Sequence, residues 1–242
     1  ILQKLNTNQS VEKARDPRAL ILAPTRELAI QINDSIRNYG RYIALKHTVI
    51  FGGVKQGPQV KLLGKGMDII VATPGRLLDL INQGFCSLNK IECFVLDEAD
   101  RMLDMGFIRD VEKVVKILPV KRQSLFFSAT MPDSVIKLSE TMLKSPKQVK
   151  VKSTLTPVER IAQSVIVIEP QDKVLQLITL LKDKVFDSVI VFTRTKHKAN
   201  RICQKLISVG IEAEAIHSNK SQAARQRALN GFKDGNIKIL IA

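Results

Sequence analysis

The chain has 242 residues, 45% of them hydrophobic, which is enough for a buried core and suits either one large domain or about two of ordinary size. Thirty-eight Lys and Arg against 23 Asp and Glu give a formal net charge of +15, which favours a polyanion, above all nucleic acid, as partner. The sequence contains no membrane-span pattern and no export signal, which argues against a membrane protein. Its three cysteines lack metal-ligand spacing and are odd in number, which argues against a zinc site and against a disulfide-bonded secreted protein and favours a cytoplasmic location.

Charge alone does not prove nucleic-acid binding, because many of these side chains could lie on solvated helix faces. Aromatic residues make up only 5% of the chain, and there is no Trp. Rows of stacked bases are therefore not expected, and any nucleic acid would be held through its phosphates.

Short apolar runs alternate with segments of helical periodicity along the chain, for example the helical pattern of Leu28, Ile32 and Ile36. The alternation predicts an α/β fold with parallel sheets covered by helices on both faces. A polar stretch at 153–160 predicts a linker between two domains, 1–152 and 161–242. The predicted strands are 19–24, 47–51, 67–72, 92–96, 123–127, 147–151, 162–168, 188–193, 212–217 and 237–242.

Acidic residues follow the predicted strand 92–96 at the edge of the sheet where α/β proteins bind ligands. The two-residue period of a strand predicts that Asp97 and Glu98 point to opposite sides. One carboxylate could hold Mg²⁺ through water while the other orients a water, as phosphoryl transfer from a nucleotide to water requires. The alternative is that these acids only cap a helix that begins near Asp100.

Two strand-to-helix turns, "PTRELA" (24–29) and "TPGR" (73–76), place Thr25 or Thr73 where it can cap a helix. Each then puts an arginine, Arg26 or Arg76, in the first turn, where a cation opposes the helix dipole. A bound phosphate would reverse that cost, and Gly75 would leave backbone amides open to it. An ordinary strand-to-helix turn explains either motif alone.

Two further strand ends carry small or hydroxyl side chains. Gly53, in the Gly52-Gly53 doublet, would let a polyanion backbone approach, although a simple glycine turn explains it nearly as well. Ser128 and Thr130, in "SAT", either cap a helix that starts near Pro132 or relay hydrogen bonds between the acidic strand end and the second domain.

In this order the motifs resemble those of the DEAD-box ATP-dependent RNA helicases of superfamily 2, and of their bacterial RhlE-like branch in particular. "DEAD" stands at 97–100, "VIVFTRT" at 189–195 resembles the family's motif IV, and residues 222–225 resemble its QxxR element. The resemblance covers essentially the whole chain. It implies two RecA-like parallel-sheet domains joined by a short linker, ATP and Mg²⁺ as cofactors, and RNA as the partner.

The resemblance also implies roles for particular residues. Asp97 would bind the Mg²⁺ of Mg-ATP through water, and Glu98 would activate the attacking water. Asp100, Ser128 and Thr130 would couple the nucleotide site to domain closure, which bends RNA and locally unwinds short duplexes. The residues that would contact the RNA backbone are Thr25, Arg26, Gly53, Thr73, Gly75 and Arg76 in the first domain and Arg194, Thr195, Gln222 and Arg225 in the second.

The sequence also departs from the family pattern. It contains no G-x-x-x-x-G-K-[ST] phosphate loop, "ILQKL" resembles the end of the helix that follows that loop, and "KILIA" stops before the family's last motifs. We therefore expect a chain truncated at both ends, with two incomplete domains and no useful ATP turnover alone. We also expect a sheet that lacks a central strand and leaves buried backbone groups unpaired unless another segment supplies it. A non-catalytic RNA-binding fragment and a related DNA translocase remain alternatives.

Overall fold

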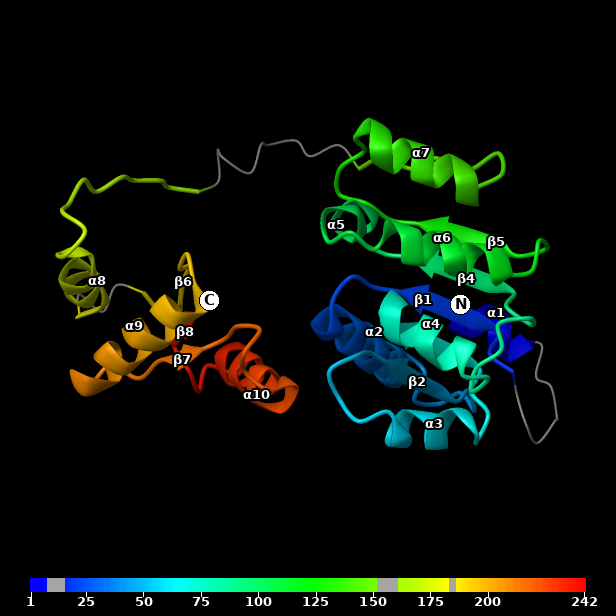
Figure 1. The fold of residues 1–242 in the computed structure, drawn as a ribbon, viewed down its shortest axis with the longest axis horizontal. Helices are drawn as coiled ribbons and strands as arrows, with labels where there is room; N and C mark the ends of the chain where they lie inside the picture. The colour runs from blue at the N-terminus through cyan, green and yellow to red at the C-terminus, as the bar shows by residue number, and fades with distance from the viewer. Residues whose placement is uncertain (8–15, 152–160, 183–185) are drawn as a thin grey trace. The chain divides into compact units, whose positions relative to one another are not determined.

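The computed structural model describes residues 1–7, 16–151, 161–182 and 186–242. These residues form two compact units, Ile1–Gln148 and Val149–Ala242 (Figure 1). The linker predicted at 153–160 lies outside the described residues.

Unit 1 is built on a five-stranded parallel sheet with the strand order β2-β3-β1-β4-β5. The strands are β1 (Ala19–Leu22), β2 (His47–Ile50), β3 (Ile69–Ala72), β4 (Cys93–Leu96) and β5 (Gln123–Phe126). The helices are α1 (Leu2–Thr7), α2 (Arg26–Tyr39), α3 (Gly57–Leu63), α4 (Pro74–Asn82), α5 (Ala99–Asp104), α6 (Ile108–Ile117) and α7 (Asp133–Met142).

Helices cover both faces of this sheet, as predicted (Figure 1). Successive strand residues point to opposite faces, so β1 buries Leu20 and Leu22 on one face and Ala19 and Ile21 on the other. Helices α4, α5, α6 and α7 pack on the first face, and α1 and α2 pack on the second. With both faces buried, the strands are continuous apolar runs, as is typical of parallel sheets.

Unit 2 contains a smaller parallel sheet with the order β6-β8-β7. Its core includes Ile178, Ala199, Leu206 and Ile241, from helices and strands that again alternate along the chain. The elements are α8 (Lys173–Lys182), β6 (Val189–Val191), α9 (Lys196–Ser208), β7 (Glu214–Ala215), α10 (Gln222–Lys233) and β8 (Ile239–Ile241).

Two predicted strands, 147–151 and 162–168, are wrong, because the residues described there form no strand. Val149, Val165 and Val167 are 89%, 90% and 94% exposed. These runs have strand-like composition, but a strand also needs a neighbour to pair with its backbone, and no described strand pairs with either run.

The expected gap inside the first sheet is also not found. All five described strands pair continuously, and the outer edge of β5 has no partner among the described strands. Strand β5 is exposed or half-buried along its length, whereas the central strands β1, β3 and β4 are fully buried. An edge strand can solvate its unpaired groups, so the buried strands keep their hydrogen bonds.

The three cysteines form no disulfide. Cys86, Cys93 and Cys203 are free and buried. Burial raises the pKa of the Cys86 thiol to about 12, so this group stays protonated at neutral pH. Among the described residues, no helix has the length and apolar character needed to cross a lipid bilayer.

Candidate functional site

The strands of unit 1 end in register. Leu22 of β1 is aligned with Ala72 of β3 and Leu96 of β4, Ile50 of β2 with Ala72, and Leu96 with Phe126 of β5. Every site residue predicted in the first domain follows one of these strand ends by one to four residues. The sheet therefore collects five segments of the sequence at its carboxyl edge, where α/β folds bind ligands.

The strand order divides this edge into two halves. Strands β2, β3 and β1 are neighbours and lead into Gly53, Thr73 and Thr25. Strands β4 and β5 are neighbours and lead into the acidic cluster at Asp97 and into Ser128. Residues suited to contact a phosphate backbone thus lie on one half, and carboxylates and hydroxyls lie on the other.

The acidic half turns sharply after β4. Asp97 Oδ1 accepts a hydrogen bond of 2.9 Å from the Glu98 backbone N–H, and Glu98 has left-handed backbone angles, φ 47° and ψ 54°. The two-residue alternation predicted for these side chains is wrong here, because extended geometry has ended before Glu98. A non-glycine residue in this conformation costs about 1–2 kcal/mol, so the surrounding fold must impose the turn.

The carboxylates at this edge suit a hydrated divalent cation better than a protein cage. Asp97 is half-buried, and one of its oxygens is used by the Glu98 amide. In the part of the chain that the structure describes, no cluster of three or more His, Cys, Asp or Glu side chains could enclose a metal ion. Mg²⁺ commonly binds through one or two carboxylates while keeping its waters and phosphate ligands, and a single half-exposed aspartate fits that chemistry.

Asp100, Ser128 and Thr130 form a hydrogen-bond network across β4 and β5. Thr130 donates to Asp100 Oδ2 from its backbone N–H at 2.9 Å and from its hydroxyl at 2.8 Å. The Asp100 N–H donates to Ser128 Oγ at 3.2 Å, and that hydroxyl donates to the Thr130 carbonyl at 2.7 Å. Partial burial raises the pKa of Asp100, but the donors from Thr130, Arg101 and Ser128 together outweigh it and hold the pKa below its usual value.

The two threonine turns differ. Thr25 caps α2, with its hydroxyl accepting from the Leu28 N–H at 3.2 Å, as predicted. Thr73 precedes α4 with extended backbone angles, but its side chain makes no cap hydrogen bond, so that predicted cap is wrong. Pro74 at the start of α4 lacks an N–H, which leaves fewer amide donors for a cap to satisfy.

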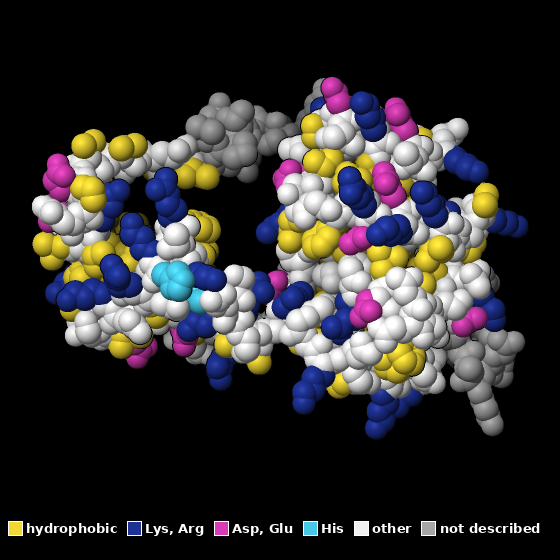
Figure 2. Space-filling view, in the orientation of Figure 1, with side chains coloured by type: hydrophobic (Ala, Val, Ile, Leu, Met, Phe, Trp, Pro, Cys, Tyr) yellow, Lys and Arg dark blue, Asp and Glu magenta, His cyan; other side chains and the backbone are white. Residues whose placement is uncertain are grey.

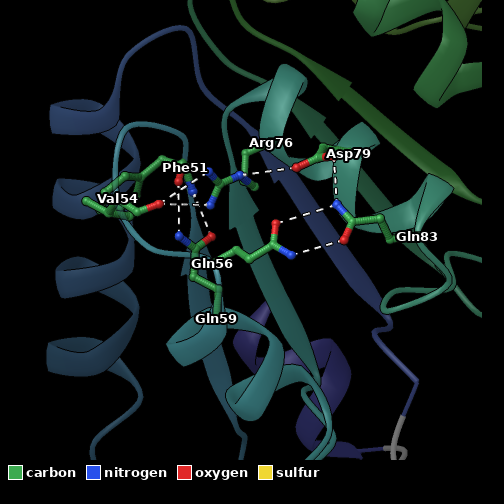
Figure 3. Close-up of polar contacts among 7 residues, drawn as sticks. All are labelled: Phe51, Val54, Gln56, Gln59, Arg76, Asp79 and Gln83. Atoms are coloured by element: carbon green, nitrogen blue, oxygen red, sulfur yellow. Dashed lines mark hydrogen bonds and ion pairs between the residues drawn. The ribbon is translucent and has the colours of Figure 1, made fainter.

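The loop at residues 51–56, called the 51–56 loop below, lies against Arg26 and is bonded by Arg76, whose contacts Figure 3 shows. Gly53 has a φ of 75°, and a Cβ placed on it would lie 2.3–2.5 Å from the Arg26 guanidinium atoms. Arg76 donates from Nη1 and Nη2 to the Val54 carbonyl, both at 3.3 Å. Glycine adopts this backbone conformation without strain and leaves the space beside the Arg26 guanidinium free of a side chain.

In unit 2, Arg194 and Thr195 follow strand β6 and are exposed. Thr195 caps α9 by accepting from the Lys198 N–H at 3.2 Å, in the same manner as Thr25. Gln222 and Arg225 lie in the first turn of α10, where Gln222 is only 9% exposed and Arg225 is half-buried. All four residues lie near a strand end or a helix start.

Four polar residues around the 51–56 loop were not predicted from the sequence: Gln56, Gln59, Asp79 and Gln83 (Figure 3). The spacing of Asp79 three residues after Arg76 is a signal for an ion pair on one helix face. No local pattern indicates that Gln59 bonds the backbone of Phe51, because that contact depends on how α3 packs beside β2.

Basic side chains are not confined to the candidate site. Figure 2 shows Lys and Arg spread over the visible face of both units rather than gathered in one patch. The positive charge therefore supplies a general attraction for polyanions, while the candidate contacts come from particular loops.

Two protein families match this chain. Residues 1–138 match the family described as DEAD/DEAH box helicase, and residues 172–242 match the family described as helicase conserved C-terminal domain.

Individual relatives are similar over the whole chain. The DEAD-box ATP-dependent RNA helicase CshA of Geobacillus kaustophilus is 39% identical over 242 residues, which cover 100% of this chain and 51% of the relative. CshA of Streptococcus pneumoniae is 38% identical and 45% covered. The chain therefore spans about half the length of these curated relatives.

Solved structures of DEAD-box proteins are also similar over nearly the whole chain. S. cerevisiae Dbp5 bound to RNA and ADP BeF3 is similar with a TM-score of 0.81 and 31% identity, covering 97% of this chain and 59% of that one. A DEAD box protein from Methanococcus jannaschii has a TM-score of 0.55 and 39% identity, with 96% of this chain and 62% of that one covered.

Proposed function

Since the chain belongs to the DEAD/DEAH box helicase family, we propose that it acts as an ATP-dependent RNA helicase. It binds the RNA backbone without reading base sequence and, on binding ATP, opens short duplexes locally by domain closure. The assignment to the RhlE-like branch stays a prediction. We also propose a cytoplasmic location, on the ground that its three cysteines are free thiols.

The division of the sheet edge carries this proposal. Five strand ends lie in register, and the residues proposed to contact RNA follow β2, β3 and β1, while the acidic and hydroxyl residues follow β4 and β5. The Asp100–Thr130 hydrogen bonds join the β4 and β5 segments on the acidic half. A protein that couples nucleotide hydrolysis to movement on a polyanion needs two such sites on one rigid element.

The acidic half would serve the nucleotide. Asp97 would hold Mg²⁺ through water, and the ion would supply charge neutralisation at the phosphates of ATP. Glu98, whose side chain is 40% exposed, orients the attacking water and accepts its proton. Asp100, Ser128 and Thr130 fix the turn between these groups and the end of β5, so that a change at the nucleotide alters the backbone there.

The other half would serve RNA, through phosphates and sugars. In unit 1 these contacts come from the turns after β1, β2 and β3, and in unit 2 from the starts of α9 and α10. Contacts of this kind position a strand without reading bases, and the 2′-hydroxyl allows RNA to be distinguished from DNA. The proposed RNA-binding residues are Thr25, Arg26, Gly53, Thr73, Gly75, Arg76, Arg194, Thr195, Gln222 and Arg225.

The decisive experiment measures ATP hydrolysis by a protein in which this sequence stands between a phosphate-loop segment and the family's last motifs, with RNA, with DNA and with neither. We expect stimulation by RNA, and a loss of about 100-fold or more in Glu98→Gln, because removing a general base typically costs that much. Glu112→Gln, which changes an exposed glutamate on α6, is the control and should keep normal turnover.

Each alternative predicts a different result. Equal stimulation by DNA would replace RNA with nucleic acid in general and favour a translocase. RNA binding that is steeply salt-dependent but indifferent to ATP would favour a non-catalytic RNA-binding protein. Full turnover in Glu98→Gln would remove the proposed role of that carboxylate.

A further inference from the structure

We propose that Gln59 and Asp79 are positioning residues of the RNA-binding face, which hold the 51–56 loop and the Arg76 guanidinium in the arrangement that receives the RNA backbone. Neither residue belongs to the motifs that carry the family resemblance. The inference rests on the proposed function, since it concerns how the same face is built (Figure 3).

Gln59 fixes the point at which strand β2 becomes the loop. Its side chain is buried, and its Nε2 donates to the Phe51 carbonyl at 3.0 Å while its Oε1 accepts from the Phe51 N–H at 3.3 Å. The side-chain amide therefore pairs with both backbone groups of Phe51, as a neighbouring strand would. Because β2 lies at the edge of the sheet, this pairing sets the direction in which the chain enters Gly52.

Asp79 fixes the orientation of the Arg76 guanidinium through its Nε, while the loop binds the Nη1 and Nη2 atoms. Its Oδ2 lies 3.5 Å from Arg76 Nε, and its Oδ1 accepts from Gln83 Nε2 at 2.7 Å. With Nη1 and Nη2 on the Val54 carbonyl, the guanidinium is held between α4 and the loop, and the Arg76 side chain is only 15% exposed. An arginine bound at both ends has one orientation instead of many.

The far end of the loop is closed by two amides. Gln56 Nε2 donates to Gln83 Oε1 at 3.0 Å, and Gln83 Nε2 lies 3.5 Å from Gln56 Oε1. Hydrogen bonds and the Arg76–Asp79 ion pair thus connect Val54 through Arg76, Asp79 and Gln83 to Gln56 (Figure 3). The loop is tied at both ends while its middle, Gly53, remains exposed.

This frame gives an RNA strand a preformed surface. Gly53 presents a bare backbone beside the Arg26 guanidinium, and Arg76 bonds the next residue of the loop, Val54. Loops that are ordered before binding do not have to be ordered by the ligand, which strengthens binding without any new contact. Gln59 and Asp79 would therefore act on RNA without touching it.

The effect of removing the Asp79 charge on RNA affinity distinguishes this positioning role from simple electrostatic attraction. Removing the Asp79 carboxylate makes the face more positive, which by itself should strengthen the binding of a polyanion. If Asp79 positions Arg76 and the loop, removing the carboxylate should weaken binding instead. Asp110 offers a matched control. Asp79 and Asp110 line one groove between α4 and α6, and Asp110 likewise forms an ion pair with a residue three positions away, Lys113.

The test is the dissociation constant of a single-stranded RNA oligonucleotide, measured on the 242-residue chain at several salt concentrations. We expect Asp79→Asn to bind roughly three- to ten-fold more weakly and with a shallower salt dependence, since hydrogen bonds to charged groups are the stronger ones. Asp110→Asn should bind as tightly as the unmodified chain or slightly more tightly. Gln59→Met, which is similar in size, leaves the net charge unchanged and removes both hydrogen bonds to Phe51, should weaken binding in the same direction as Asp79→Asn.

Hydrogen exchange separates positioning from a general loss of stability. Asp79→Asn should speed exchange of the Phe51 amide, which donates to Gln59 Oε1 at 3.3 Å, while the amides of β1 and β3 stay protected. Equal or tighter RNA binding by Asp79→Asn would overturn the inference, as would weakening that follows only the thermal midpoint. Failure of the unmodified chain to bind RNA at any salt concentration would instead count against the proposed function itself.

Discussion

At the scale of single residues, the Asp100 carboxylate gives a prediction that pH can test. Its folded-state pKa is depressed, so the ionised form stabilises unit 1 above the unfolded-state pKa, and this contribution is lost as the pH falls through the folded value. Removing the Thr130 hydroxyl in Thr130→Val takes away the donor that lies 2.8 Å from Asp100 Oδ2. The pKa of Asp100 should then rise toward its usual value.

The measurement is a carboxyl NMR titration of Asp100 in both proteins. Thr141→Val is the control, because the Thr141 hydroxyl donates to Leu138 within α7 and does not contact Asp100. An unchanged Asp100 titration in Thr130→Val would show that the hydroxyl contributes little. The depressed pKa of Asp100 also makes the free energy of unfolding fall in acid. Thr130→Val should therefore lose less of its free energy of unfolding between neutral pH and the acid range than the unmodified chain does.

Residues of the site were predictable from sequence where a local rule applies. Thr25 and Thr195 cap helices because a hydroxyl immediately before a helix finds the free amides of its first turn. The left-handed backbone of Glu98 was not predicted, because no local sequence pattern marks such a turn between β4 and α5. Gln59 was missed for the same reason, since its partner, Phe51, is set by the tertiary packing of α3 beside β2.

At the scale of elements, the N-cap of α2 is expected to carry a measurable part of the stability of unit 1. Thr25→Ala leaves the Leu28 N–H without its acceptor and should lower the free energy of unfolding by about 1 kcal/mol. Thr25→Ser keeps the oxygen and should lose much less. Urea denaturation of the three proteins measures the difference, and a serine variant as unstable as the alanine variant would assign the loss to the methyl group instead of the cap.

Elements were predictable where periodicity and burial agree. Strands β1, β3 and β4 are buried on both faces and read as unbroken apolar runs, while the stripe of Leu28, Ile32 and Ile36 marks α2. The runs at 147–151 (KQVKV) and 162–168 (AQSVIVI) also contain β-branched residues but have no neighbour to pair with among the described strands. Composition specifies that a segment can form a strand, whereas pairing depends on which other strands the fold brings beside it.

At the scale of the whole molecule, the net charge of +15 and the candidate site make different predictions for RNA binding. A diffuse positive field would release counterions in proportion to all the nearby cations. A built site would release them chiefly at its own arginines, which are Arg26, Arg76, Arg194 and Arg225. For single strands each phosphate contact contributes about 0.7 to the slope of log K against log salt, so four contacts predict a slope of about −3.

Two neighbouring arginines of α10 decide between these cases. Arg225 is half-buried in the first turn of the helix, and Arg227 is exposed two residues later on a different face. Arg225→Gln should weaken RNA binding and reduce the slope by about 0.7, while Arg227→Gln, with the same change in net charge, should leave both nearly unchanged. Equal effects of the two substitutions, or a slope far steeper than −3, would show that the overall charge and not the site determines how tightly this chain holds RNA.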